Sequence, residues 1–114
     1  MDRRIHDRAP VTFWMRVTDI ASPEFSASGE TIDISESGIG IYLPLRFTPG
    51  SLVRLNIKDS VLYGFVSHSV PERSFFRTGI AVVQVSVGTS GLSQLLKATL
   101  QEAMPVLRIT SIPA

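Results

Sequence analysis

Cysteine is absent from the 114-residue sequence, which excludes disulfide bonds, thiolate zinc sites and cysteine nucleophiles together. This absence fits a reducing compartment. No apolar run is long enough to cross a bilayer, and the first four residues lead into no apolar stretch of the kind found in signal peptides. We therefore expect a cytoplasmic protein without a transmembrane segment.

A large excess of charge of either sign is also missing. Eleven basic residues oppose ten acidic ones, for a formal net charge of +1. Bulk charge therefore does not draw the chain to nucleic acid or to an anionic membrane. Lysine is scarce, because only Lys58 and Lys97 stand against nine arginines. Three of those arginines lie within the first eight residues, so the bias toward arginine is concentrated at the N-terminus.

Hydrophobic periodicity predicts a β-rich domain that ends in one helix. Apolar residues alternate with polar ones, as in half-buried strands, over about six segments: 11–18, 31–35, 39–43, 53–58, 61–70 and 78–87. Gly64 falls inside one of these segments and is expected to mark a bulge or bend. Residues 92–103 instead show the i, i+3, i+4 spacing of an amphipathic helix. Thr89 or Ser90 can cap its N-terminus, and Pro105 can end it.

This order of elements divides the chain into three parts. Residues 1–10 form a charged arm, residues 11–104 hold the strands and the helix, and residues 105–114 form a short apolar tail. Short strands at close spacing favour a small antiparallel barrel or sandwich, and a barrel also removes exposed sheet edges. On the strands, Ile32 and Ile34 are expected to share one face. Trp14 lies on the face opposite its apolar neighbours, where it can be exposed, cover the barrel end or contact a partner, and we favour packing.

The segment from Asp33 to Gly38 carries polar side chains that a strand and a turn do not require. On a strand, Asp33 and Ser35 project from the same face. Asp33 only accepts hydrogen bonds, whereas the Ser35 hydroxyl both donates and accepts them. Gly38 provides the backbone freedom for a sharp turn or for a close approach. This pattern predicts a polar surface that can bind a ligand edge bearing N–H groups, although the same residues can also satisfy an ordinary turn.

The N-terminal arm carries the second unusual pattern, in which Arg4 and Arg8 are separated by four positions. On a helix or in a tight turn they would share one side, and in an extended arm they would straddle a ligand. The planar guanidinium group matches phosphate and the O6/N7 edge of guanine, and it can stack on a purine. A ligand with guanine and phosphate would use both properties. Without a ligand, too few apolar residues are present to hold the arm in place.

Arg4-x-x-x-Arg8 followed by Asp33-x-Ser35-x-x-Gly38 resembles the paired motif of PilZ domains, the bacterial receptors for cyclic di-GMP. The opening Arg3-Arg4 and the segments 38–41 and 77–82 are also similar to that family, so the resemblance covers nearly the whole chain. It implies an all-β fold with a C-terminal helix, built as a six-stranded antiparallel β-barrel. It also implies a ligand-binding arm over residues 1–10. The ligand-binding residues that it implies are Arg3, Arg4, Arg8, Asp33, Ser35, Gly38 and, more weakly, Arg77.

The resemblance implies a receptor that clamps cyclic di-GMP between the arm and the barrel and signals to an unidentified effector protein. A PilZ-like interaction adaptor that binds no nucleotide is the alternative, and the intact motifs argue against it. A nucleic-acid-binding barrel would need a basic groove with interleaved aromatic residues, which this composition does not favour. We expect no enzyme, no cofactor and no metal site. Neither serine of the motif lies in a Gly-x-Ser-x-Gly elbow, and both histidines, His6 and His68, are isolated in the sequence.

Overall fold

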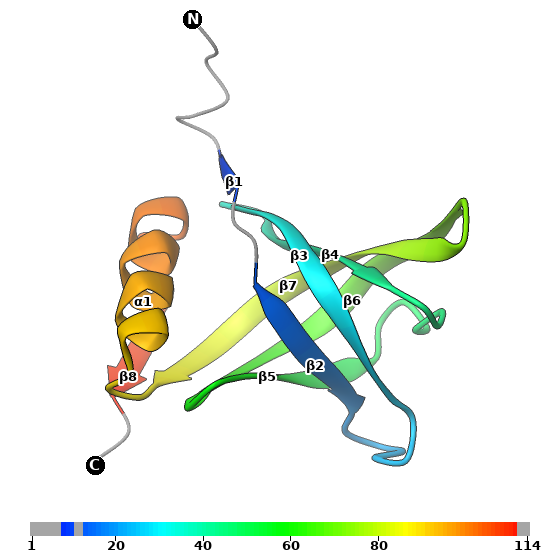
Figure 1. Cartoon of the computed structure of the whole chain (residues 1–114), viewed down its shortest axis with the longest axis horizontal. Helices are drawn as coiled ribbons and strands as arrows, with labels where there is room; N and C mark the ends of the chain where they lie inside the picture. The colour runs from blue at the N-terminus through cyan, green and yellow to red at the C-terminus, as the bar shows by residue number, and fades with distance from the viewer. Residues whose placement is uncertain (1–7, 11–12, 112–114) are drawn as a thin grey trace, which may run out of the picture.

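Six antiparallel strands close into a barrel in the computed structural model, which describes residues 8–10 and 13–111 (Figure 1). The hydrogen-bonded order runs β3-β2-β5-β6-β7-β4, and a further pairing of β4 with β3 completes the ring. The prediction of an antiparallel six-stranded barrel with a C-terminal helix is therefore confirmed. The barrel strands are β2 (Trp14–Asp19), β3 (Ser26–Ser35), β4 (Gly38–Leu43), β5 (Leu52–Ile57), β6 (Ser60–Glu72) and β7 (Phe75–Val87).

The barrel interior is filled by the apolar residues that alternate along these strands. In β5 and from Ile39 onward in β4, for example, buried residues alternate with exposed or half-buried ones. Because successive side chains on a strand point to opposite faces, this alternation leaves the intervening positions for the outer surface. The largest fully buried side chains are those of Phe47, Met15, Ile34, Ile39, Ile41, Leu43, Leu55, Leu62, Ile80, Leu96, Leu100 and Val17.

A register shift in β3 changes which residues face outward next to the predicted motif. The pairing with β4 slips between Thr31 and Asp33, so Thr31 is buried, Ile32 is half-buried and Ile34 is fully buried. The expectation that Ile32 and Ile34 share one face was wrong, because the extra residue of a bulge reverses the alternation. The bulge or bend predicted at Gly64 agrees with the structure, since the β6–β7 register shifts between Tyr63 and Gly64.

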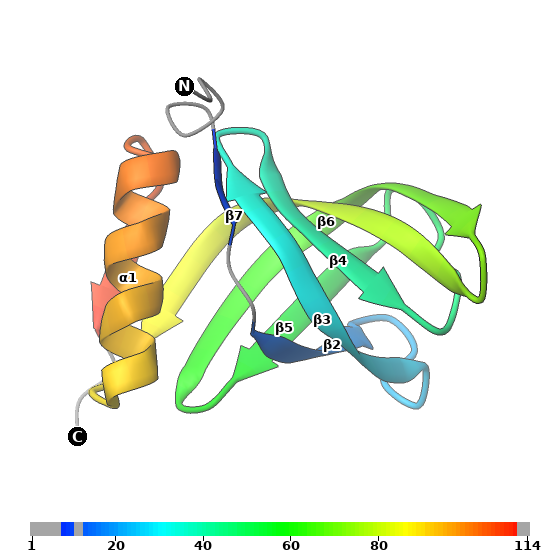
Figure 2. The same cartoon turned by 45° about the horizontal axis from the view of Figure 1, so that its top comes forward.

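Two short strands lie outside the six that the sequence predicted. β1 (Arg8–Pro10) pairs antiparallel with β3, and β8 (Ile109–Ser111) pairs parallel with β7. Both figures show β1 beside β3, at the end of the barrel where the helix lies (Figures 1 and 2). Three residues give too short a periodicity to be recognised in a sequence, and what makes these segments strands is a partner strand that is distant in the chain.

The helix α1 (Gly91–Ala103) contacts β1, β3 and β7. Ser90, one of the two residues predicted as the cap, is its N-cap, and the Ser90 hydroxyl accepts a hydrogen bond from the Ser93 amide. Leu96 and Leu100 are fully buried against the barrel core. Leu95, which the spacing placed on the same stripe, is 56% exposed. Among the described residues, no helix is long and apolar enough to cross a membrane.

Asp59, in the turn between β5 and β6, attaches the N-terminus of α1 to the barrel. Its carboxylate accepts hydrogen bonds from the amides of Thr89 and Ser90, at 2.8 and 3.1 Å, and from the hydroxyls of Ser90 and Ser93. The side-chain hydrogen bonds from Ser93 and Ser90 hold the pKa of Asp59 well below its usual range. Carboxylates are favoured at helix N-termini because the first amides there lack partners within the helix.

Trp14 does not pack as expected, since 66% of its surface is exposed. It occupies an outward position of β2, opposite Glu30 of β3, while Phe13 and Met15 on either side are buried. The alternation of the strand therefore outweighs the hydrophobicity of this single residue, and a lone exposed apolar side chain is common on protein surfaces.

Candidate functional site

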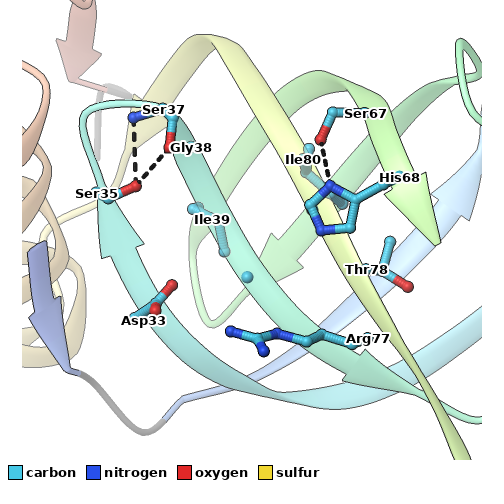
Figure 3. A pocket seen from close by; sticks show the side chains of 12 residues that line it. Asp33, Ser35, Ser37, Gly38, Ile39, Ser67, His68, Arg77, Thr78 and Ile80 are labelled. Atoms are coloured by element: carbon cyan, nitrogen blue, oxygen red, sulfur yellow. Dashed lines mark hydrogen bonds between the residues drawn. The ribbon is translucent and has the colours of Figure 1, made fainter. Parts of the chain in front are cut away.

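The outer face of the barrel carries a hollow of about 380 Å³ that is lined by four strands and by the β3–β4 turn (Figure 3). The residues that line it are Asp33, Ser35, Ser37, Gly38, Ile39, Gly40, Ser67, His68, Arg77, Thr78, Gly79 and Ile80. Four of the seven residues predicted to bind ligand, namely Asp33, Ser35, Gly38 and Arg77, lie among them. Arg77 is more than forty positions from Asp33 in the sequence, and β7 reaches β3 only through β4, which lies between them.

The floor of the hollow is a row of residues that face one another across neighbouring strands. Asp33 of β3 pairs with Gly40 of β4, Gly40 pairs with Gly79 of β7, and Gly79 pairs with His68 of β6. The two central glycines carry no side chain, so the two outer residues form the walls of the row. A Cβ atom at Gly40 would lie 3.0 Å from Asp33 Oδ1, and one at Gly79 would lie 2.2 Å from His68 Cε1. The bare backbone is therefore what leaves room for these two side chains.

The β3–β4 turn forms one rim of the hollow and depends on Gly38. Gly38 has φ +136°, and a Cβ atom there would lie 2.1 Å from the Ile80 carbonyl oxygen on β7. Only glycine combines that backbone conformation with so close an approach. The Ser35 hydroxyl hydrogen-bonds the Ser37 hydroxyl at 2.8 Å and accepts from the Ser37 amide at 3.3 Å. Ser35 therefore takes part in ordinary turn chemistry while it also borders the hollow.

Arg77 and Asp33 give the hollow groups of opposite charge. Figure 3 shows their side chains pointing toward one another from β7 and β3, across β4. Arg77 is exposed and pairs with Tyr42 of β4 in the next row along the sheet. The Tyr42 hydroxyl donates a 2.7 Å hydrogen bond to Glu72, and this bond raises the pKa of Tyr42. The hydroxyl proton of Tyr42 is therefore used in the hydrogen bond to Glu72.

The arm reaches the site through β1. The register places Arg8 opposite Ser35 and Pro10 opposite Asp33, so the backbone of the arm enters along the motif strand. Two further predicted ligand residues, Arg3 and Arg4, lie outside the described residues.

Sequence reasoning did not assign the other eight lining residues to a ligand site, and His68, Gly40 and Gly79 are the ones among them that form the row beside Asp33. The available signal was that the two glycines occupy outward positions on alternating strands, where glycine weakens a strand unless another group approaches closely. His68 was interpreted as an isolated strand residue, and it does lie in β6. What a sequence alone cannot provide is the register that sets His68, Gly79 and Gly40 side by side.

This set of groups is suited to binding a polar ligand. One carboxylate, several hydroxyls, a guanidinium and an imidazole can pair with the edges of a base and with phosphate. Over the described ranges 8–10 and 13–111, no cluster of three or more histidine, aspartate or glutamate side chains is placed to hold a metal ion. The groups that line the hollow can recognise a ligand through hydrogen bonds and charge.

Comparison with protein families matches residues 2–97 to the PilZ domain. A search of curated proteins produced no match. The matched region includes the arm, all six barrel strands and the first half of α1. The match covers well over half of the sequence, and the closed barrel with its C-terminal helix is consistent with the fold of that family. The chain therefore belongs to the PilZ domain family.

Proposed function

We propose that this protein is a receptor for cyclic di-GMP, with the ligand held between the N-terminal arginines and the outer face of the barrel. The observation that carries the proposal is the convergence of Asp33, Ser35, Gly38 and Arg77 on one hollow. The entry of β1 beside Ser35 supports it further, because the arm arrives at the rim of the same hollow. Membership of the PilZ family makes cyclic di-GMP the ligand class to test first.

In this proposal the two sides of the site have complementary tasks. The arginines Arg3, Arg4 and Arg8 neutralise the phosphates and contact the guanine edges or faces, because a guanidinium group is planar, charged and a fork of donors. Asp33 accepts hydrogen bonds from the N–H groups of a guanine, and Ser35 contacts the base or its phosphate. Arg77 adds positive charge at the opposite side of the hollow.

The output of ligand binding is proposed to be a change in what another protein can bind. Closing the arm over the ligand would alter the surface next to β1, and α1 contacts β1 directly. An effector protein that contacts this region would then sense the ligand. We propose that the protein acts as a cytoplasmic adaptor of this kind and catalyses no reaction, in keeping with PilZ domains as binding modules.

Isothermal titration with cyclic di-GMP tests this proposal. The wild-type protein should bind saturably, and Arg8→Ala and Asp33→Ala should each weaken binding by roughly 30- to 1000-fold, which is the cost of about 2–4 kcal/mol for a lost desolvated charge contact. Arg54→Ala is the matched control, because Arg54 lies on β5, outside the hollow, and donates to Asn56 within its own strand.

The control variant should bind like the wild type, and all variants should keep the wild-type circular dichroism spectrum. Absence of binding by the folded wild-type protein at high micromolar ligand would contradict the receptor proposal. That outcome would favour an interaction adaptor that needs no nucleotide.

A further inference from the structure

His68 stands out among the residues that line the hollow because it belongs to neither sequence motif. It is exposed on β6, at the far end of the row that begins at Asp33. Its imidazole is also the one aromatic ring among the lining residues that the structure describes. Every other described group at the hollow is a carboxylate, a guanidinium, a hydroxyl, an aliphatic side chain or glycine backbone.

The position of the ring is set by its neighbours. A Cβ atom at Gly79 would lie 2.2 Å from His68 Cε1 and 2.7 Å from Nδ1, so the imidazole occupies the space that a side chain at residue 79 would fill. Ser67 holds the same ring from the side, through a 3.1 Å hydrogen bond between its hydroxyl and His68 Nδ1. Figure 3 shows the ring lying across β7, with that hydrogen bond drawn.

No side chain projects from the two glycines of the row, and the Asp33 carboxylate borders the second of them, with Oδ1 3.0 Å from the place of a Cβ atom at Gly40. Gly40 follows Gly79 in the row, and Asp33 lies beyond it. A flat heterocycle stacked on the His68 ring would have its edge toward the Asp33 carboxylate and the Arg77 guanidinium (Figure 3). Stacking on an aromatic face and hydrogen bonding at the edge are the two means by which proteins hold an unpaired purine.

We propose that His68 is a ligand-contacting residue whose imidazole, held over Gly79 by Ser67, is the surface on which a purine base of the ligand stacks. This inference rests on the proposed function, since it places a base of cyclic di-GMP in the hollow. It also assigns a task to Gly79: the missing side chain is what allows the ring to lie there.

Substitutions at His68 separate stacking from charge. Titration of cyclic di-GMP should show about 5- to 150-fold weaker binding by His68→Ala, the usual effect of removing one stacking partner. His68→Phe keeps a ring without a charge and should bind within about threefold of the wild type. His68→Lys has a charge without a ring and should bind as weakly as the alanine variant. Phe65→Ala is the control, because Phe65 is exposed on the same strand and lies outside the hollow.

A second variant tests the position of the ring rather than its presence. Gly79→Ala should weaken binding because its methyl group displaces the imidazole, whereas Gly91→Ala meets open space and should not. Adding Gly79→Ala to His68→Ala should cause little further loss, since the two changes act on the same contact. On ligand addition, the imidazole C–H proton signals of His68 should move upfield through the ring current of the base, with His6→Gln used to assign the two histidines.

Several results would overturn the inference while leaving the receptor proposal intact. One is a wild-type protein that binds and a His68→Ala variant that binds equally well. Another is retention of affinity by the lysine variant with loss in the phenylalanine variant, which would assign His68 to phosphate instead. Failure of the wild-type protein to bind at all is a different outcome, because it removes the proposed function itself.

Discussion

Two glycines that are two residues apart on β4 should respond in opposite ways to the same substitution. Gly38→Ala places a Cβ atom 2.1 Å from the Ile80 carbonyl oxygen, a backbone atom of β7 that cannot turn away. It also imposes φ +136° on a residue with a side chain. At Gly40 the nearest atom to a new Cβ is Asp33 Oδ1 at 3.0 Å, which belongs to a side chain that can move.

The expected cost of Gly38→Ala follows from these two effects. Backbone strain of this kind costs about 1–3 kcal/mol, and forcing extra volume into a packed contact costs about 1–3 kcal/mol more. The free energy of unfolding should thus fall by about 2–6 kcal/mol. For a chain of 114 residues the unfolding entropy at the midpoint is about 0.24 kcal/mol/K, so the melting temperature should drop by roughly 8–25 °C. For Gly40→Ala we expect a change within about 1 kcal/mol, or roughly 4 °C.

Thermal unfolding followed by circular dichroism, with urea unfolding at 25 °C as a second measurement, checks both values. Ligand titration should give the complementary result, because the methyl group of Gly40→Ala lies on the floor of the hollow and moves Asp33. We expect that variant to stay folded and to bind cyclic di-GMP more weakly. A Gly38→Ala protein that melts within about 3 °C of the wild type would refute the reasoning, since β4 would then not depend on the close contact with Ile80.

Three further predictions concern the helix and the charge of the ligand. Asp59→Asn should lower the melting temperature at pH 7, because the carboxylate that caps α1 through Ser90 and Ser93 is lost. The pKa of Asp59 is depressed in the folded state, so its ionised carboxylate stabilises the fold at pH values above the ordinary aspartate pKa near 3.9. This stabilisation is lost as pH falls further, and the difference in melting temperature between variant and wild type should therefore shrink between pH 4 and pH 2. Leu100→Ala should cost about 2–5 kcal/mol in urea unfolding, whereas Leu95→Ala, at a position 56% exposed, should cost less than about 1 kcal/mol; equal costs would contradict the assignment of the buried face. The affinity for cyclic di-GMP should fall as salt rises, because phosphate charge must be neutralised, and a salt-independent affinity would argue against phosphate contacts.

Much of the fold could be read from local patterns. The alternation in segments such as 39–43 and 53–58 predicted buried and exposed faces that the structure confirms. The helix and its Ser90 cap were predicted as well, because spacing and capping are properties of neighbouring residues. The predictions that were wrong, at Ile32 and at Trp14, came from extending a local pattern across a bulge and from weighting hydrophobicity above position.

The residues of the candidate site also fall into two groups: those that the sequence could indicate and those that only the structure brings to the hollow. Asp33, Ser35 and Gly38 form a contiguous motif, so they could be singled out in the sequence, and the structure places them at one hollow. Whether they bind ligand stays a prediction, as it does for Arg3, Arg4 and Arg8. His68 could not have been assigned to the same hollow, since nothing near it in the sequence indicates a ligand.

The sequence by itself determined the class of fold, the order of the six barrel strands and the helix, and the two motifs, because periodicity, capping and turn chemistry act over a few residues. The tertiary structure alone decided which distant residues share the outer face of the barrel. Strand register is set by the packing of the whole core, and a single bulge shifts every residue beyond it. That register brings His68, Gly79 and Gly40 into line with Asp33 and directs β1 along the motif strand.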